Sequence, residues 1–210
     1  MADLQRSWRR AWRGIGAADE GAAVCAALLA AYGAPERSYH TLQHLHECIE
    51  RFEGCSDLAA RPAEVEAALW FHDAVYDVVR ADNERRSADW ARAAALASGV
   101  PADVAERLDA LVMATRHAAP PVGADAELLV DIDLAILGAD ADRFAEYEQQ
   151  IRREYAHVAA PAFAARRREI LAAFLRGERI YATPRLHAEL EQRARANLSL
   201  ALAGDVARGL

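Results

Sequence analysis

The chain has 210 residues, 53% hydrophobic and 27% charged, so it can bury a large core and is not a disordered chain. Its formal net charge of −7 argues against binding to nucleic-acid polymers, because neutralising phosphates requires clustered positive charge. All 25 basic residues are arginine, and the absence of lysine excludes Schiff-base chemistry and a phosphate-loop lysine.

Nothing in the N-terminal half predicts export or a membrane anchor. Residues 1–16 lack the apolar stretch of a signal peptide, and the most apolar run, 22–34, is too short to span a bilayer. Cys25, Cys48 and Cys55 have no C-x-x-C spacing, so we expect reduced thiols that are buried as small hydrophobic side chains. We therefore predict a cytoplasmic protein without membrane contact.

Helix formers dominate nearly every segment, and apolar residues recur at spacings of three and four. Glycine, proline and capping residues interrupt this pattern at 33–38, 54–57, 98–103, 117–125, 138–140 and 181–185. These breaks predict an all-α fold without strands, made of about nine helices in one domain over 1–210. We expect N-terminal helices over 1–35 and C-terminal helices over 141–210, with the first two helices and the last one as outer layers.

In the first half of the chain, ionisable residues stand inside apolar segments. In "YHTLQHLHECIERF", His40 and His44 are four residues apart and would share a helix face, whereas His46 would point to solvent. In "ALWFHDAVYD", His72 and Asp73 end an apolar segment that we predict as a helix over 63–73.

Further along the chain, His117 ends another predicted helix, and Asp131 and Asp133 lie within the apolar run "LLVDIDLAILG". Burying such groups without partners would cost several kcal/mol each. Two explanations are open. The groups satisfy one another as hydrogen-bonded core residues, or they bind a divalent cation, for which neutral imidazole and carboxylate are natural ligands.

The order of these motifs resembles the HD superfamily of metal-dependent phosphohydrolases, and within it a bacterial group without an assigned substrate. The dipeptide His-Asp alone is a weak signal, but the ordered set is specific and covers residues 37–200. The matching segments are "RSYHTLQH" (37–44), "ALWFHDAVYD" (68–77), "DNERRSA" (82–88), "ATRH" (114–117), "DIDLAILG" (131–138), "EYAHV" (154–158), "RREILAAFL" (167–175) and "ARANL" (194–198). The resemblance implies an HD-type helical bundle with its metal-site core over 37–140.

Four residues match the metal ligands of that family: His44, His72, Asp73 and Asp133. Asp131 competes with Asp133, but the family usually ligates through the acid just before the helix continues. The implied cofactor is one divalent ion, which could be Mn, Mg, Co, Zn, Ni or Fe. Tyr76 stands where two-metal phosphodiesterases carry a further histidine, so one ion is expected rather than two, although bridging by Asp73 would allow a second.

The resemblance also implies catalytic roles for three residues. "YHTLQH" is similar to a segment of cyclic-nucleotide phosphodiesterases in which the first histidine, here His40, protonates the leaving group; alternatively His40 only supports His44. "HDAVYD" resembles "HDxxED" of stringent-response hydrolases, so Asp77 would share a helix face with Asp73 and activate water.

Two of these assignments have ordinary structural alternatives. Asp77 could instead be a helix C-terminal acid bonded to Arg85 or Arg86. Glu84 is either an acid that supports the site or a residue favoured at a helix start by the helix dipole.

The implied reaction is hydrolysis of a phosphate ester of a nucleotide or other small phosphorylated metabolite. Arg37, Arg116 and Arg167, together with His117, are candidates for binding that substrate, since guanidinium groups suit phosphate oxygens. In so arginine-rich a chain each of them could equally be a surface residue. The alternatives are an iron-dependent HD oxygenase and a catalytically silent metal- or nucleotide-binding module. Apolar helix faces could serve a homodimer or the core.

Overall fold

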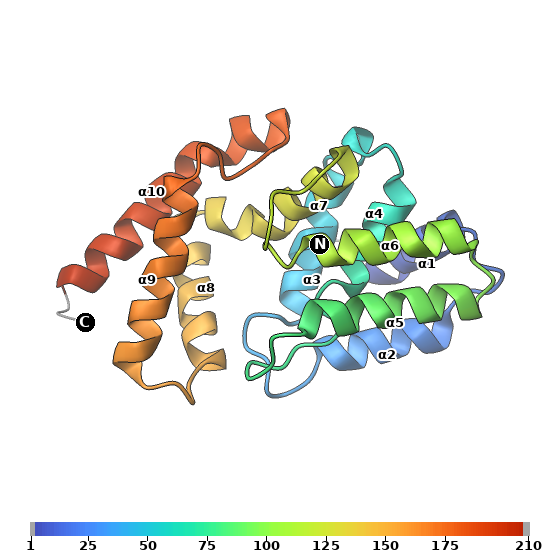
Figure 1. Cartoon of the computed structure of the whole chain (residues 1–210), viewed down its shortest axis with the longest axis horizontal. Coiled ribbons are helices and arrows are strands. Elements are labelled where there is room, and N and C mark those ends of the chain that lie inside the picture. The colour runs from blue at the N-terminus through green and yellow to red at the C-terminus, as the bar shows by residue number, and fades with distance from the viewer. Residues whose placement is uncertain (1–2, 208–210) are drawn as a thin grey trace. The chain divides into compact units, whose positions relative to one another are not determined.

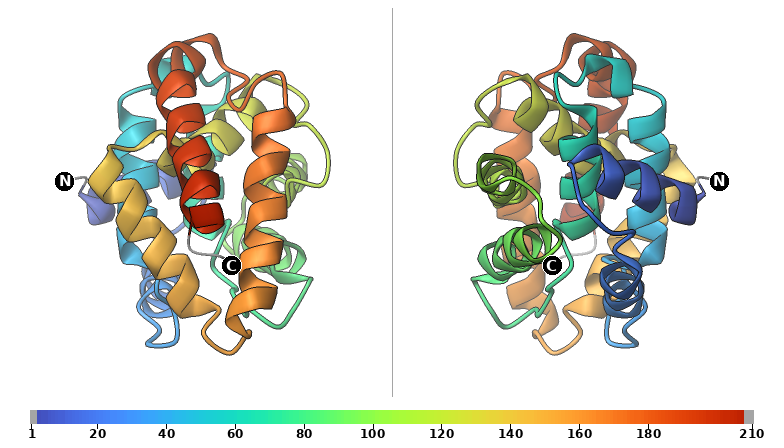
Figure 2. Two further views of the ribbon diagram at one scale, coloured as in Figure 1. Left: turned by 90° about the vertical axis from the view of Figure 1, so that its left-hand side faces the viewer. Right: turned by 90° about the vertical axis from the view of Figure 1, so that its right-hand side faces the viewer.

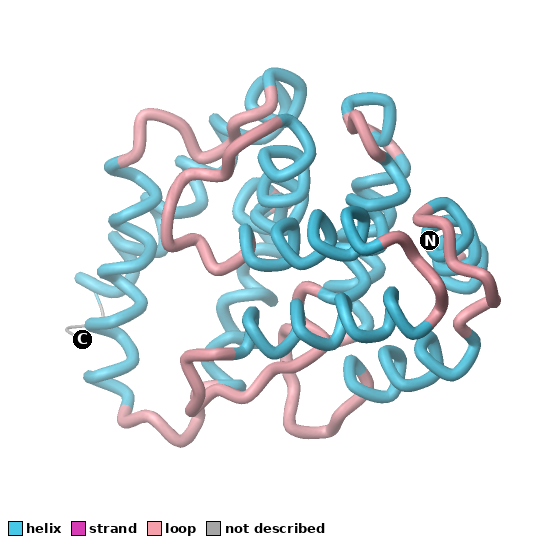
Figure 3. The backbone as a smooth tube through the Cα atoms, turned by 45° about the vertical axis from the view of Figure 1, so that its right-hand side comes forward, coloured by secondary structure: helices cyan, strands magenta, loops and turns pink. Residues whose placement is uncertain are grey.

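The computed structural model describes the backbone of residues 3–207 and the side chains up to residue 204. These residues form ten α-helices and two short 3-10 helices, and no strand occurs among them (Figures 1 and 3). The all-α prediction is therefore confirmed. By its internal contacts the chain divides into two compact units, the first ending at Asp133 and the second beginning at Leu134. Two compact units can belong to one domain, so the single-domain assignment stays a prediction.

The first unit contains seven α-helices and one 3-10 helix. In chain order they are α1 (Leu4–Gly14), α2 (Ala22–Tyr32), α3 (Leu42–Glu53), η1 (Ser56–Leu58), α4 (Pro62–Phe71), α5 (Asn83–Ala97), α6 (Ala102–Ala114) and α7 (Ala124–Asp133). The predicted breaks at 33–38, 54–57 and 98–103 fall at the junctions between these helices. The loop over 72–82, which follows α4, was not predicted.

Helix α4 is the centre of the first unit. It contacts α1, α3, α5, α6 and α7, and α5 and α6 pack side by side next to it (Figure 2). Every residue from Glu64 to Phe71 is buried. Pro62 begins the helix at a position where the missing N–H has no intrahelical acceptor to lose. A helix that is apolar nearly all round can be stable only if other helices cover all its sides.

The N-terminal helix α1 belongs to this core. Trp8 and Trp12 are 2% and 0% exposed, and their rings stack with centroids 4.6 Å apart. Trp8 also meets the edge of Trp70 of α4 at 5.3 Å. Arg6, Arg9 and Arg13 of α1 are exposed, which agrees with the expected outer position of this helix, while its inner face supplies two of the largest buried side chains.

Arginines neutralise two buried acids of α4. Glu66 is 1% exposed, accepts a hydrogen bond from Ser7 Oγ at 2.6 Å and binds the guanidinium group of Arg10. Glu64 is bound by Arg107 through two parallel hydrogen bonds of 2.7 and 2.8 Å. A buried carboxylate needs such a partner, since burial of an isolated charge is costly. For both of these acids the partner is arginine.

The second unit contains η2 (Leu134–Gly138), α8 (Ala141–Glu154), α9 (Ala160–Arg176) and α10 (Pro184–Ala207). Helix α10 packs on η2 and on α9. The approach to η2 is close, since a Cβ atom at Gly138 would lie 2.8 Å from Cβ of Leu190. Asn197 of the "ARANL" segment donates its amide to the carbonyls of Leu137 and Ala139, both at 2.9 Å, and so satisfies the end of η2.

A buried acid fastens the loop between α9 and α10. Glu191 accepts hydrogen bonds from the backbone N–H groups of Ile180 and Tyr181 at 3.0 and 3.2 Å, and from Arg195 at 2.7 Å. Burial alone would raise the pKa of Glu191, but the two backbone donors and Arg195 lower it overall. The ionised carboxylate therefore stabilises the folded state above the ordinary pKa of glutamate, and this contribution disappears as the pH falls through the lowered value.

We expect Glu191→Gln to lower the free energy of unfolding at pH 7 by about 1.5–3 kcal/mol, since hydrogen bonds to a charged acceptor are lost. The difference from the wild type should shrink below about pH 4.3, the ordinary pKa of glutamate. Urea unfolding between pH 3 and pH 7 measures both effects. Glu178→Gln is the control, because Glu178 is exposed. A pH-independent difference would contradict this account.

Three further predictions concern the cysteines, the apolar residues of α7 and membrane-spanning helices. Cys25, Cys48 and Cys55 are buried and free, as predicted. The apolar residues Leu128, Leu129 and Ile132 of α7 are buried within the chain, where α7 contacts α3, α4 and α6. They serve the core, and a homodimer stays a prediction. Among the described helices, none is both long and apolar enough to cross a bilayer.

Candidate metal centre

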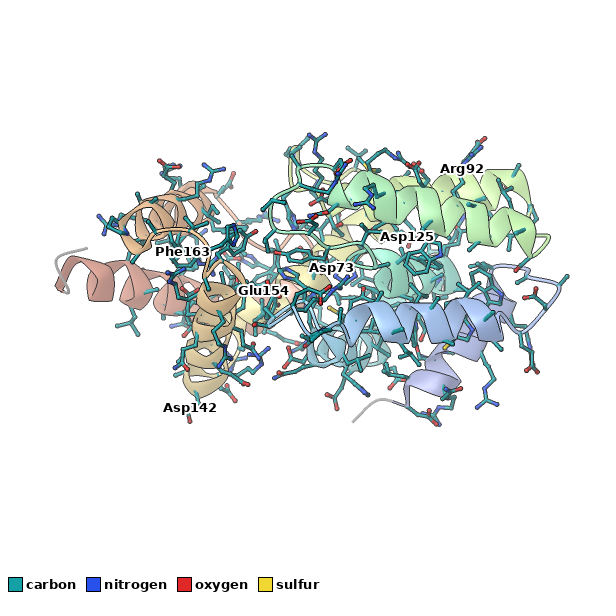
Figure 4. The ribbon with its side chains drawn as sticks, turned by 90° about the horizontal axis from the view of Figure 1, so that it is seen from below. Asp73, Arg92, Asp125, Asp142, Glu154 and Phe163 are labelled. Carbon is teal, nitrogen blue, oxygen red and sulfur yellow. The ribbon has the colours of Figure 1, made fainter. Side chains whose placement is uncertain are left out.

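Three helices of the first unit bring two imidazoles and two carboxylates together. His44 lies in the first turn of α3, His72 and Asp73 directly follow α4, and Asp133 is the last residue of α7. His44 and His72 are 2% and 1% exposed. Asp73, labelled in Figure 4, and Asp133 have side chains that are 17% and 15% exposed. Only the two acids are therefore open to solvent to any extent.

The potential ligand atoms lie within contact of one another. Nε2 of His44 is 3.1 Å from Nε2 of His72. Oδ2 of Asp73 is 3.4 and 3.0 Å from these two nitrogens, and Oδ1 of Asp133 is 3.3 and 3.5 Å from them. Ligands about 2.0–2.2 Å from one ion, at angles of about 90–110°, are separated by about 3.0–3.5 Å. The four residues thus fit a single ion.

The hydrogen bonding of His72 supports this fit. Its Nδ1 lies 2.8 Å from the carbonyl oxygen of Leu69, an acceptor only, so Nδ1 carries the proton and donates. In the neutral ring Nε2 then presents its lone pair to the cluster, an arrangement common among metal-binding histidines. Two protonated Nε2 atoms could not face each other at the separation found between His72 and His44. Something positive must lie between them, either a shared proton or a cation.

The acids of this cluster differ from the buried acids Glu64 and Glu66 of α4. Glu64 and Glu66 are neutralised by arginine, whereas Asp73 and Asp133 have no arginine partner in the described part of the chain. Two carboxylates with two neutral imidazoles carry the charge that a divalent cation would balance.

Among the side chains alone, the imidazoles and carboxylates favour each other's charged forms. Burial by itself would lower the pKa of His72, but Asp73 and Asp133 outweigh it and hold that pKa well above its ordinary value. Burial would raise the pKa of Asp133, but hydrogen bonds from His117, His44 and His72 hold it well below its ordinary value. Protons and a cation therefore compete for the same atoms.

Cys48 is a possible ligand that sequence reasoning missed. His44, Cys48, His72 and Asp133 form a group whose ligand atoms all lie within 4.8 Å of one another and could hold a metal ion. We favour Asp73 over Cys48 because Sγ is 3.7 and 3.8 Å from the two ring nitrogens of His44, and so lies beside the ring rather than in front of Nε2. The signal in the sequence was the i, i+4 spacing of His44 and Cys48.

Asp133 reaches the two imidazoles through Oδ1. Asp131 is 1% exposed, and the preference for Asp133 over Asp131 as the ligand stays a prediction. The other oxygen of Asp133, Oδ2, lies 3.2 Å from Nε2 of His117. His117 has a left-handed backbone (φ 51°), which is uncommon for a residue with a Cβ atom. The contact between His117 and Oδ2 orients the carboxylate of Asp133.

His40 does not share a helix face with His44, contrary to the prediction. Helix α3 begins only at Leu42, because the side chain of Thr41 caps it by accepting a hydrogen bond from the N–H of Gln43. The ring of His40 instead stacks on Tyr76 with centroids 3.8 Å apart. It is close enough to Asp73 for its charge to help lower the pKa of that acid, against the raising effect of burial.

The helical placement of Asp77 is also wrong, because α4 ends at Phe71 and the chain then forms turns. Asp77 is exposed, and its Oδ1 accepts a hydrogen bond from the N–H of Val79 at 3.1 Å. The alternative bond to Arg85 or Arg86 is not found among the described residues either, and Arg85 binds Asp109 instead. Whether Asp77 activates water stays a prediction.

The "DNERRSA" segment holds this turn region in place. Asn83 accepts a hydrogen bond from the N–H of Asp77 at 3.1 Å and donates one to its carbonyl at 2.9 Å. Ser87 accepts a hydrogen bond from the N–H of Val75 at 3.0 Å. Glu84 is half-buried in the first turn of α5 and has no hydrogen bond or ion pair among the described residues, so the helix-start interpretation fits it better.

Two of the predicted phosphate-binding arginines are engaged within the chain. Arg37 donates to the backbone carbonyls of His40, Asp73 and Ala74 at 3.0, 2.7 and 2.9 Å. In the second unit, Arg167 is 8% exposed and ion-paired with Glu148. Arg116 is exposed and has no partner among the described residues.

We expect Arg37→Lys to weaken metal binding by about 10- to 100-fold, because two guanidinium nitrogens reach these three carbonyls and a single ammonium nitrogen cannot take both positions, so the backbone of Asp73 would shift. Titration with Co²⁺ monitored by isothermal calorimetry measures this. Arg51→Lys, a change on the same helix as His44, is the control. If Arg37 serves only to bind substrate, metal affinity will be unchanged.

Comparisons of the chain with protein-family models, curated proteins and solved structures found no match.

Proposed function

We propose that this protein is a metal-dependent phosphohydrolase of the HD type, a single-domain helical bundle that cleaves a phosphate ester of a nucleotide or other small phosphorylated metabolite. The observation that carries the proposal is the convergence of His44, His72, Asp73 and Asp133, with imidazole nitrogens and carboxylate oxygens 3.0–3.5 Å apart. The same four residues are those that the motif order implies.

The surroundings favour one metal ion over two. Oδ2 of Asp133 is occupied by His117, and Tyr76, which has no group suited to bind a metal as histidine does, is stacked on His40. A divalent cation held by the four residues would activate water and polarise a phosphoryl oxygen. The negative charges of the two carboxylates would balance the charge of that cation.

The residues around the ligands have distinct proposed roles. His40 lies beside Asp73 at the partly open side of the cluster and is the candidate that protonates the departing oxygen. Its stacking on Tyr76 fixes the plane of the imidazole. Asp77 is the candidate that orients water, through the carboxylate oxygen that does not bind Val79.

A phosphate-release screen tests the proposal. Purified protein is incubated with nucleotides, sugar phosphates and bis-p-nitrophenyl phosphate, with manganese, magnesium, cobalt or zinc added in turn. We expect turnover that is lost in Asp133→Asn and reduced by about 100-fold or more in His40→Gln, since a positioned general acid contributes that much. His157→Gln, a change at an exposed histidine of the second unit, should retain turnover.

Bound metal without turnover on any substrate would overturn the hydrolase assignment. An absorbance of bound iron that responds to oxygen would then identify the oxygenase alternative, and nucleotide binding without turnover would identify the silent module.

A further inference from the structure

A pocket lies in the first unit, away from the metal ligands. It is an open pocket with a volume of about 690 Å³, bordered by the start of α4, the end of α6, the loop over 115–123 and the first turn of α7. This volume is in the range of small-molecule sites. None of the metal ligands lines it.

The walls of this pocket are mostly apolar. They include Leu111, Met113 and Ala114 of α6, and Pro120, Pro121 and Val122 of the loop. Val122 is 92% exposed, which is unusual for a large aliphatic side chain and leaves apolar surface at the rim. Such walls suit the apolar part of a ligand.

The charged side chains of the pocket leave one cation unneutralised. Three arginines and two acids line it, a net charge of +1. Glu64 is bound by Arg107, and Asp125 accepts hydrogen bonds from the N–H groups of residues 60 and 61 and lies 4.0 Å from Arg61. Arg116 has no partner among the described residues. A guanidinium group beside apolar walls matches an anion with an apolar body.

The loop that lines this pocket also serves the metal cluster. Arg116 and Ala118 face the pocket, whereas His117 between them does not line it and contacts Asp133 instead. The backbone of His117 is left-handed at the point where successive side chains alternate between the pocket and the metal cluster. A ligand in the pocket would therefore contact both neighbours of the residue that orients Asp133.

We propose that this pocket is a binding site for a small amphiphilic anion, such as a carboxylate or phosphate monoester with an aliphatic or aromatic body, held by Arg116 and the apolar walls. The site is distinct from the metal cluster and does not depend on the proposed hydrolase activity. Arg116 is assigned to this pocket rather than to the phosphate group that is cleaved.

Fluorescence titration with two matched probes tests the proposal. 8-Anilinonaphthalene-1-sulfonate is an apolar anion, and N-phenyl-1-naphthylamine is its uncharged counterpart. We expect Arg116→Gln to raise the dissociation constant of the anionic probe by about tenfold, the effect of one charge-assisted hydrogen bond, and to leave that of the neutral probe unchanged. Ala114→Leu, which fills the pocket, should weaken both probes.

Arg92→Gln is the charge-matched control, because Arg92, labelled in Figure 4, is exposed on α5 and does not line the pocket. It should bind both probes as the wild type does. Competition by octanoate and octyl phosphate, with octanol as the neutral comparison, identifies the preferred anion. Equal weakening by Arg116→Gln and Arg92→Gln, or no effect of Ala114→Leu, would refute a site in this pocket.

Discussion

Purified protein should contain about one divalent metal ion per chain, and His72→Ala should contain almost none, because the site loses one of its two imidazole ligands and the remaining ligands hold the ion much more weakly. Metal analysis by plasma mass spectrometry measures this. At a metal concentration one hundred times the dissociation constant, bound metal should stabilise the wild type by about 2.7 kcal/mol. Chelation should therefore lower the melting temperature of the wild type and leave that of His72→Ala unchanged.

The matched control for this prediction is His157→Ala, which removes an exposed imidazole of the second unit. It should keep its metal and its response to chelator. Cys48→Ser separates the two candidate ligand sets: it should retain the metal if Asp73 is the fourth ligand and lose it if the sulfur is. A wild-type protein that binds no divalent ion under any condition would leave His72 and Asp73 as a hydrogen-bonded pair of the core.

Trp8→Ala should destabilise the protein by about 3–5 kcal/mol, since it removes a fully buried indole and leaves a cavity between α1 and α4. The cavity would be lined by Trp12 and Trp70, whose rings now contact Trp8 at 4.6 and 5.3 Å. The indole N–H of Trp8 also donates to the carbonyl of Glu20 at 3.0 Å, and that carbonyl would lose its partner. Urea unfolding monitored by circular dichroism measures the change.

Leu200→Ala is the control for this core substitution, because Leu200 is 70% exposed and its truncation should change the free energy of unfolding by less than about 0.5 kcal/mol. An effect of Trp8→Ala as small as that of this control would contradict the prediction. Such a result would show that the aromatic cluster contributes little to the stability of the first unit.

Much of the candidate site could be predicted from the sequence. His44, His72, Asp73 and Asp133 stand out because each is an ionisable group in an apolar segment, and a chain buries such groups only with partners. The same reasoning could not identify the partners of Glu64 and Glu66. They also lie in an apolar segment, but their partners Arg107 and Arg10 are 43 and 56 residues away in sequence.

The errors around His40 and Asp77 have a common cause. Both residues were placed by continuing a helix past its end, and spacing of four residues means a shared face only inside a helix. Thr41 begins α3 after His40, and hydrogen bonds from Asn83 and Ser87 hold the segment after α4 in turns. Such side-chain to backbone hydrogen bonds depend on residues that folding brings together.

By itself the sequence determined the all-helical fold, most of the breaks between helices and the residue types able to bind a cation, because helix propensity, capping and hydrophobic periodicity act within a few residues. Only the tertiary structure decided that Arg37 supports the backbone of Asp73, that His117 orients Asp133 while Arg116 lines a separate pocket, and that the inner face of α1 places Trp8 against Trp70 of α4. Those outcomes depend on which helix faces pack together, and packing is a property of the whole chain.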